Sequence, residues 1–190
     1  MTATLIDQFR EIFSCVSYRG DQHTNILIQE SDKLATLKKV TLTASNGNWI
    51  AITPDKGRGK KAEMSPLLAT GAAHKHHCAC DCVVFTLNQN VLTVIYIDLK
   101  SGKPNGYENQ FKSTRQFVRY VIGLLEEFSE QKIKIDNERY VIFYGGEKRL
   151  LNKTPSVPKI QKVKSSSPNN AYKLQVDNDA SVYLNKLLTQ

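Results

Sequence analysis

The chain of 190 residues lacks any long apolar run. No stretch approaches the roughly twenty consecutive apolar residues that cross a bilayer. Its first residues, Met1 to Thr4, do not form the basic segment and apolar core of a secretion signal. We therefore expect a soluble, cytoplasmic protein without a membrane partner.

Cysteine is also scarce, and its spacing argues against disulfides. Three of the four cysteines, Cys78, Cys80 and Cys82, alternate along one segment. Alternate residues of an extended segment are poorly placed to bridge one another. The sequence also contains no G-x-x-x-x-G-K-[ST] phosphate loop. These absences favour a reducing compartment and exclude a P-loop nucleotide hydrolase.

Basic residues outnumber acidic ones, 26 against 18, which gives a formal net charge of +8. An anionic partner is expected, with nucleic acid first and an acidic membrane surface second. Apolar residues make up 41% of the chain, which is enough for one proper core.

The composition changes after Gly145 and Gly146. We expect one α/β domain over residues 1–150 and a basic linker, rich in proline and serine, over 151–171. A short docking segment over 172–190 is predicted to end in a helix. The basic tail could strengthen nucleic-acid binding or could simply be solvated.

Apolar spacing predicts an amphipathic helix that begins near Leu5 and ends near Gly20. Strands are expected at 26–28, 39–42 and 49–52, with a hairpin turn at 45–48. This front section is predicted to extend the sheet.

A second hairpin is expected between the apolar runs 83–87 and 91–97, which are separated by a polar turn. A long helix over 109–128 follows, and its apolar face is continuous. This helix would cross over to a parallel strand at 139–144 through a right-handed connection.

The hairpin carries a cluster of charged residues at its open end. Asp98 and Lys100 are two positions apart on one strand, so they share a face, and Asp81 can meet them from the other strand. Two carboxylates held together favour a divalent cation such as Mg²⁺ or Mn²⁺. A lysine beside such a cation can activate water, as phosphodiester hydrolysis requires. The alternative is an exposed ion pair of little consequence.

These residues resemble the motif of the PD-(D/E)XK nuclease superfamily, which has an acid at one strand start and acid-x-lysine on the next strand. Here the motif is Asp81 followed by Asp98-Leu99-Lys100. Cys80 takes the place of the name-giving proline. The order of hairpin, helix and strand extends the resemblance over roughly 63–148.

The resemblance implies a restriction-endonuclease-like fold, a mixed central sheet flanked by helices. It also implies a metal-dependent nuclease in which Asp81, Asp98 and the Leu99 carbonyl bind Mg²⁺ or Mn²⁺ and Lys100 assists water attack. Many members add an upstream glutamate, for which Glu63 is the first candidate here and Glu11 the second. DNA is the expected substrate ahead of RNA, in a restriction, repair or anti-phage system. The protein could act as a homodimer or within a larger complex.

Basic and polar residues near this motif are candidates for nucleic-acid contacts. The glycine-rich segment 54–61 has the composition of a loop that touches phosphates, although it could be a solvated loop. The start of the long helix points its positive end toward the same region. The predicted nucleic-acid-binding residues are Lys56, Arg58, Lys60, Lys61, Gln110 and Lys112.

Two alternatives of other classes remain open. One is a nucleic-acid-binding or assembly subunit that keeps the nuclease fold without cleaving. The other is a zinc-dependent adaptor, because 74–82 holds three histidines and three cysteines. Burial of Cys80 or Cys82 in the core is the simpler interpretation of that segment.

Overall fold

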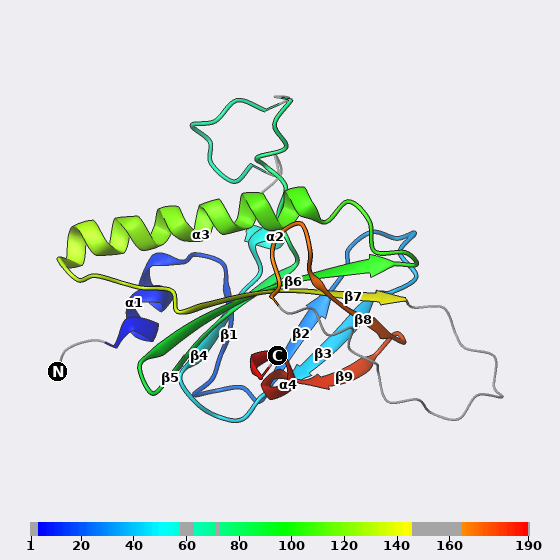
Figure 1. Cartoon of the computed structure of the whole chain (residues 1–190), viewed down its shortest axis with the longest axis horizontal. Helices are drawn as coiled ribbons and strands as arrows, with labels where there is room; N and C mark the ends of the chain where they lie inside the picture. Colours follow the sequence, from blue (N-terminus) through cyan, green and yellow to red (C-terminus); the bar gives the residue numbers. More distant parts are fainter. Residues whose placement is uncertain (1–3, 58–62, 71–72, 146–164, 190) are drawn as a thin grey trace.

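The structure is a computed structural model that describes residues 4–57, 63–70, 73–145 and 165–189. Within these ranges the chain folds into nine strands and four helices, which confirms the predicted α/β class (Figure 1). The elements are α1 (Leu5–Ile12), β1 (Val16–Arg19), β2 (Asn25–Gln29), β3 (Lys39–Thr43), β4 (Trp49–Ile52), α2 (Pro54–Gly57), β5 (Cys82–Asn88), β6 (Val91–Ser101), α3 (Glu108–Ser129), β7 (Asn137–Gly145), β8 (Tyr172–Val176), β9 (Ala180–Tyr183) and α4 (Leu184–Leu188).

The larger sheet has six strands in the order β1-β4-β5-β6-β7-β8. The pairs β1–β4, β4–β5 and β5–β6 are antiparallel, whereas the pairs β6–β7 and β7–β8 are parallel. The predicted hairpin is confirmed, since β5 and β6 pair from Cys82 opposite Ile97 to Asn88 opposite Val91. Its turn uses Gln89 and Asn90, both in the left-handed region that tight hairpin turns require. The parallel pairing of β7 with β6 after α3 is also confirmed.

A smaller sheet of three strands has the order β2-β3-β9. The predicted hairpin turn at 45–48 is therefore wrong, because β3 lies in this small sheet and β4 in the large one. The segment between β3 and β4 is held instead by Trp49, whose indole Nε1 donates to the Ser45 carbonyl at 2.8 Å. Gly20 lies against Gly47, where a Cβ atom would be 2.1 Å from the Gly47 oxygen, so only glycine fits there.

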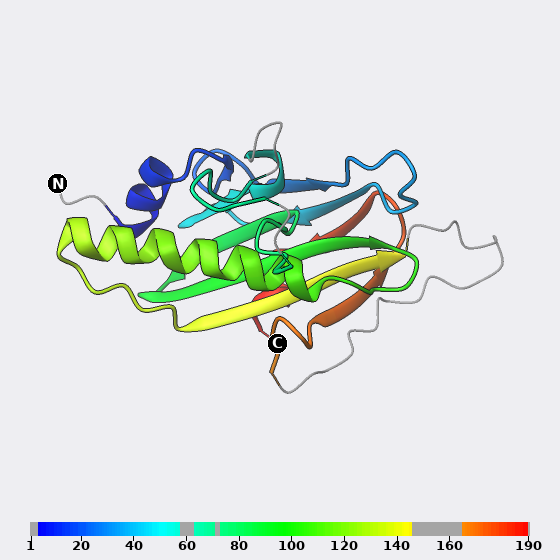
Figure 2. The same ribbon diagram turned by 90° about the horizontal axis from the view of Figure 1, so that it is seen from above.

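Three layers result from this arrangement. Helices α1 and α3 cover one face of the large sheet, and α3 runs along the sheet in the view of Figure 2. The small sheet and α4 cover the other face. Alternate residues of β6 divide between the two cores: Val94 and Tyr96 lie on the helical side, and Ile95 and Ile97 on the side of the small sheet.

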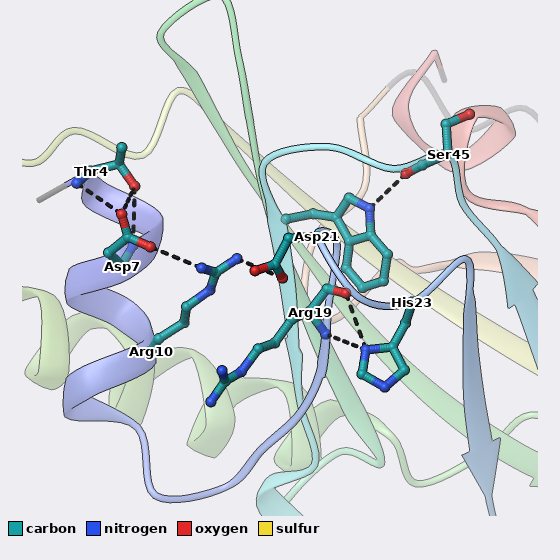
Figure 3. Close-up of polar contacts among 8 residues, drawn as sticks. Thr4, Asp7, Arg10, Arg19, Asp21, His23 and Ser45 are labelled. Atoms are coloured by element: carbon teal, nitrogen blue, oxygen red, sulfur yellow. Dashed lines mark hydrogen bonds and ion pairs between the residues drawn. The ribbon is translucent and has the colours of Figure 1, made fainter.

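The first helix is shorter than predicted. It ends at Ile12, and the residues expected to continue it to Gly20 form β1 instead. Thr4 and Asp7 form a capping box at its start, and the Arg10 side chain joins Asp7 to Asp21 (Figure 3). Pairing of β1 with β4 is a tertiary contact that the helical spacing of apolar residues could not reveal.

The C-terminal segment 172–190 contributes to both sheets. Strand β8 forms an edge of the large sheet beside β7, and β9 pairs in parallel with β3. Most of the predicted basic linker, residues 151–164, lies outside the described residues. Among the described helices, none is long and apolar enough to cross a membrane.

Candidate active site

The open end of the β5–β6 hairpin brings Asp81, Asp98 and Lys100 together. Continuing the register beyond the Cys82–Ile97 pair places Asp81 opposite Asp98. The Leu99 backbone N–H donates to Asp81 Oδ2 at 2.6 Å. Lys100 Nζ lies 2.7 Å from Asp98 Oδ2. The shared face predicted for Asp98 and Lys100 is therefore present, with Asp81 beside it.

A residue of helix α3 fixes the position of the Lys100 side chain. Gln110, in the first turn of that helix, accepts a hydrogen bond from Lys100 Nζ at 2.6 Å through Oε1. The same side chain donates from Nε2 to the Ala79 carbonyl at 3.2 Å. Gln110 thus links Lys100 to the segment that leads into Asp81. Sequence analysis predicted a nucleic-acid contact for Gln110, and the structure gives its amide these two partners.

The next turn of α3 fixes that same segment. The Cys80 backbone N–H donates to Thr114 Oγ1 at 3.0 Å, and the Thr114 side chain is fully buried. Ser113 Oγ donates to the His76 carbonyl. Residues three and four apart on a helix share one face. One face of α3 therefore carries three polar side chains, Gln110, Ser113 and Thr114, that hydrogen-bond the backbone of residues 76–80, just before Asp81.

The Asp98 carboxylate is buried, with 0% of the residue exposed. No N–H or hydroxyl group of the described residues bonds its Oδ1 atom. Burial raises the pKa of Asp98 to about 6, although Lys100 opposes that rise. Burial, followed by the charge of Asp98, raises the pKa of Asp81 well above its usual range. The ionised form of each acid is therefore disfavoured, and a cation bound between the two carboxylates would stabilise it.

A third acid, Glu30, was missed by sequence analysis. Its charge contributes, after burial, to the raised pKa of both Asp81 and Asp98. Glu30 follows β2, and its Oε1 accepts a hydrogen bond from the Asp32 N–H at 2.9 Å. The available signal was an acid at the end of an apolar strand, the position that Asp98 also has. Its distance along the chain from the hairpin hid the connection.

The other predicted residues are more dispersed. Lys56 is exposed on α2 and lines a cavity of about 390 Å³ together with Glu30. Lys112 is exposed on α3. Glu63 is partly buried and Glu11 is exposed, and within the described ranges neither contributes to the raised pKa of Asp81 or Asp98. The remaining candidates, Arg58, Lys60 and Lys61, lie outside the described residues.

The acid pair offers a divalent cation a small set of ligands. Within the described ranges, no group of three or more His, Cys, Asp or Glu side chains has the arrangement of a metal site. The pair does supply two opposed carboxylates and one buried oxygen, Asp98 Oδ1, to which no N–H or hydroxyl group in the described part of the chain donates. Mg²⁺ is commonly held by one or two carboxylates together with water and substrate phosphate. Asp81, Asp98 and the Leu99 carbonyl fit that mode of binding.

The histidine- and cysteine-rich segment has contacts of its own. Cys80 and Cys82 are fully buried, which confirms them as core residues, and burial raises the pKa of both thiols. The rings of His76 and His77 contact the Ala69 carbonyl through Nε2. Both rings therefore join their segment to the loop 63–70.

Comparisons with protein-family models, with curated proteins and with solved structures return no match for this chain.

Proposed function

We propose that the protein is a metal-dependent nuclease of the PD-(D/E)XK type, with a restriction-endonuclease-like fold, that hydrolyses phosphodiester bonds in DNA. The observation that carries the proposal is the buried Asp98 carboxylate, which lies beside Asp81 and Lys100 and whose Oδ1 accepts no hydrogen bond from an N–H or hydroxyl group of the described residues. Burying a charge without full compensation costs stability. Such a cost is common at catalytic sites, where the chemistry requires the charge.

Asp81, Asp98 and the Leu99 carbonyl would hold Mg²⁺ or Mn²⁺. When bound, the cation would supply charge stabilisation for the phosphate and a more acidic water. Glu30, which lies close enough to influence both aspartates, would add negative charge to the site and strengthen cation binding.

Lys100 would orient the attacking water or a phosphate oxygen. An ammonium group has three N–H donors. Asp98 and Gln110 take two of them, at 2.7 and 2.6 Å. Among the described residues the third has no partner, so it is available to a ligand, and the two fixed partners define its direction. This arrangement is the pre-organisation that positions a reacting group.

The net charge of +8 supports a polyanionic substrate. The site does not distinguish deoxyribose from ribose, and DNA is proposed because the resemblance favours it. A role in restriction, repair or anti-phage defence is part of the same proposal.

The test is cleavage of plasmid and single-stranded DNA with Mg²⁺ or Mn²⁺ by the wild type and two variants, Asp98→Asn and Lys100→Ala. Both changes are expected to reduce the rate by a factor of about 10² or more. Lys103→Ala, which changes an exposed lysine three residues further on, is the matched control and should cleave like the wild type. Circular dichroism establishes that each variant is folded.

Two results would overturn the proposal. One is cleavage that survives in both folded variants. The other is a wild type that cuts neither DNA nor RNA yet binds nucleic acid tightly, with the same affinity in the two variants. The second result would point to the non-catalytic subunit.

A further inference from the structure

A groove runs along α3 beside the candidate active site. Its volume is about 890 Å³, within the range of ligand-binding clefts. One wall comes from the loop 64–68 and another from residues 74–76, with α3 between them. The α3 residues that line it are Asn109, Lys112, Ser113, Gln116, Phe117 and Tyr120. We name it the α3 groove.

The α3 groove adjoins a second cavity that reaches Gln110, the hydrogen-bond partner of Lys100. This second cavity, of about 490 Å³, shares His74, Lys75, His76 and Asn109 with the groove. A polymer with a phosphate near Lys100 could therefore continue into the groove.

The groove exposes apolar and aromatic surface. Leu67 is 91% exposed and Tyr120 is 62% exposed, although both line the cleft. Phe117, in contrast, packs against the core, with its ring centroid 6.1 Å from that of Phe13. The groove thus has a fixed aromatic floor and exposed side chains at its rim, available to a ligand.

Its charge is positive. Lys75 and Lys112 line it, and none of its described lining residues is acidic. A second copy of this chain would bring another basic molecule against a basic groove, since each carries a net charge of +8. An anionic ligand with flat apolar parts suits the groove better. Aromatic side chains combined with basic ones are the usual means of binding unpaired bases.

We propose that the α3 groove binds the unpaired bases of a single-stranded or frayed nucleic acid next to the cleavage site. The ten helical steps from Gln110 to Tyr120 span about 15 Å, which corresponds to roughly two to four nucleotides. A closed duplex keeps its bases stacked inside and would offer the apolar rim only sugar and phosphate. The position of the cut phosphate rests on the proposed function, whereas base binding can be measured without cleavage.

The test is fluorescence anisotropy in EDTA, with a short labelled DNA single strand and a blunt duplex of the same sequence. Tyr120→Ala and Leu67→Ala should each weaken single-strand binding about ten-fold and leave duplex binding within about two-fold. Two control variants change side chains of equal exposure elsewhere. Tyr183→Ala matches Tyr120, since both are 62% exposed, and Leu34→Ala, at 89%, matches Leu67. Both controls should bind like the wild type.

The proposal is overturned if the groove variants lose single-strand and duplex affinity equally, or lose neither. It is also overturned if the wild type is a dimer by light scattering and Tyr120→Ala is a monomer, because a second copy would then fill the groove. If the wild type cleaves DNA but Tyr120→Ala and Leu67→Ala bind the single strand as tightly as the wild type, base binding in the α3 groove is wrong and the proposed function still stands. If Tyr120→Ala and Leu67→Ala lose only single-strand affinity but the wild type does not cleave, the proposed catalytic function is wrong and base binding in the α3 groove still stands.

Discussion

At the residue scale, the main feature is that Asp98 and Asp81 are held where ionisation is unfavourable. A carboxyl whose pKa is raised on folding binds its proton more tightly in the folded state than in the unfolded one. The free energy of unfolding therefore falls as the pH rises from about 4, the unfolded value, through about 6. At neutral pH the free energy of unfolding of the metal-free protein is therefore lower than it is at pH 4.

The variant Asp81→Asn should stabilise the metal-free protein at about pH 8. Burying a polar group without full compensation costs about 1 to 3 kcal/mol, so removing one of the two carboxylates should give a gain of that order. The gain should shrink near pH 4, where the wild-type acids are protonated. Urea unfolding in EDTA at both pH values measures it.

Mn²⁺ should raise the melting temperature of the wild type at about pH 8 but not that of Asp81→Asn. The exposed acid Asp177 provides the control, because Asp177→Asn should leave both the stability and the cation effect unchanged. A less stable Asp81→Asn at pH 8 would contradict the account of two strained carboxylates.

Under the proposed function Gln110 is a positioning residue, because it would act on the chemistry through its hydrogen bond with Lys100. Gln110→Leu should lower kcat about ten-fold or more and change KM little, since it releases the lysine without removing it. Gln110→Glu keeps an acceptor for Lys100 and should retain more activity than Gln110→Leu. Steady-state cleavage kinetics distinguish these outcomes. A change confined to KM would instead indicate that Gln110 contacts the substrate directly, as the sequence suggested.

At the element scale, α3 and the segment before β5 depend on one another. Thr114 is fully buried and bonds the Cys80 N–H. Thr114→Val keeps the shape of the side chain but leaves that N–H without a partner, so it should cost about 1 to 3 kcal/mol of unfolding free energy. Thr114→Ser keeps the hydroxyl and should lose less. Urea denaturation of both variants provides the comparison. An unchanged free energy of unfolding in Thr114→Val would show that the hydrogen bond from the Cys80 N–H to Thr114 does not stabilise the fold.

The hairpin and the long helix could be predicted from sequence because their signals are local. Alternation in β5 and β6 fixed which side chains share a face, and it correctly paired Asp98 with Lys100. The assignment of strands to sheets could not be predicted, since β3 and β4 are neighbours in sequence yet lie in different sheets. Glu30 was missed for the same reason: a contact between distant strands leaves no local pattern in one sequence.

At the scale of the whole molecule, the two faces of the large sheet have different roles. Asp98 and Lys100 follow Val94 and Tyr96 at every second position along β6 and so lie on the helical side, whereas the other side is covered by the small sheet and α4. Leu187 in α4 is 4% exposed and belongs to that second core. Stability and chemistry should therefore be separable by substitutions on opposite faces.

Leu187→Ala should lower the unfolding free energy by about 2 to 4 kcal/mol, the usual cost of a cavity at a buried leucine. Cleavage by the folded fraction, measured well below the melting temperature, should stay at the wild-type rate. Leu34→Ala, which shortens an exposed leucine, should change stability by less than about 0.5 kcal/mol. If Leu187→Ala melts like the wild type, α4 is not part of the core.

The pairing of β9 with β3 also affects the order of events during synthesis. Asn178 accepts hydrogen bonds from the backbone of Lys38, 140 residues earlier in the chain. At roughly 5–20 residues per second, a ribosome needs on the order of ten seconds to supply that partner. Until then one edge of β3 is open to any other extended peptide. A nascent chain stalled inside this interval would be a natural client for a chaperone, and completion of the small sheet would mark its release.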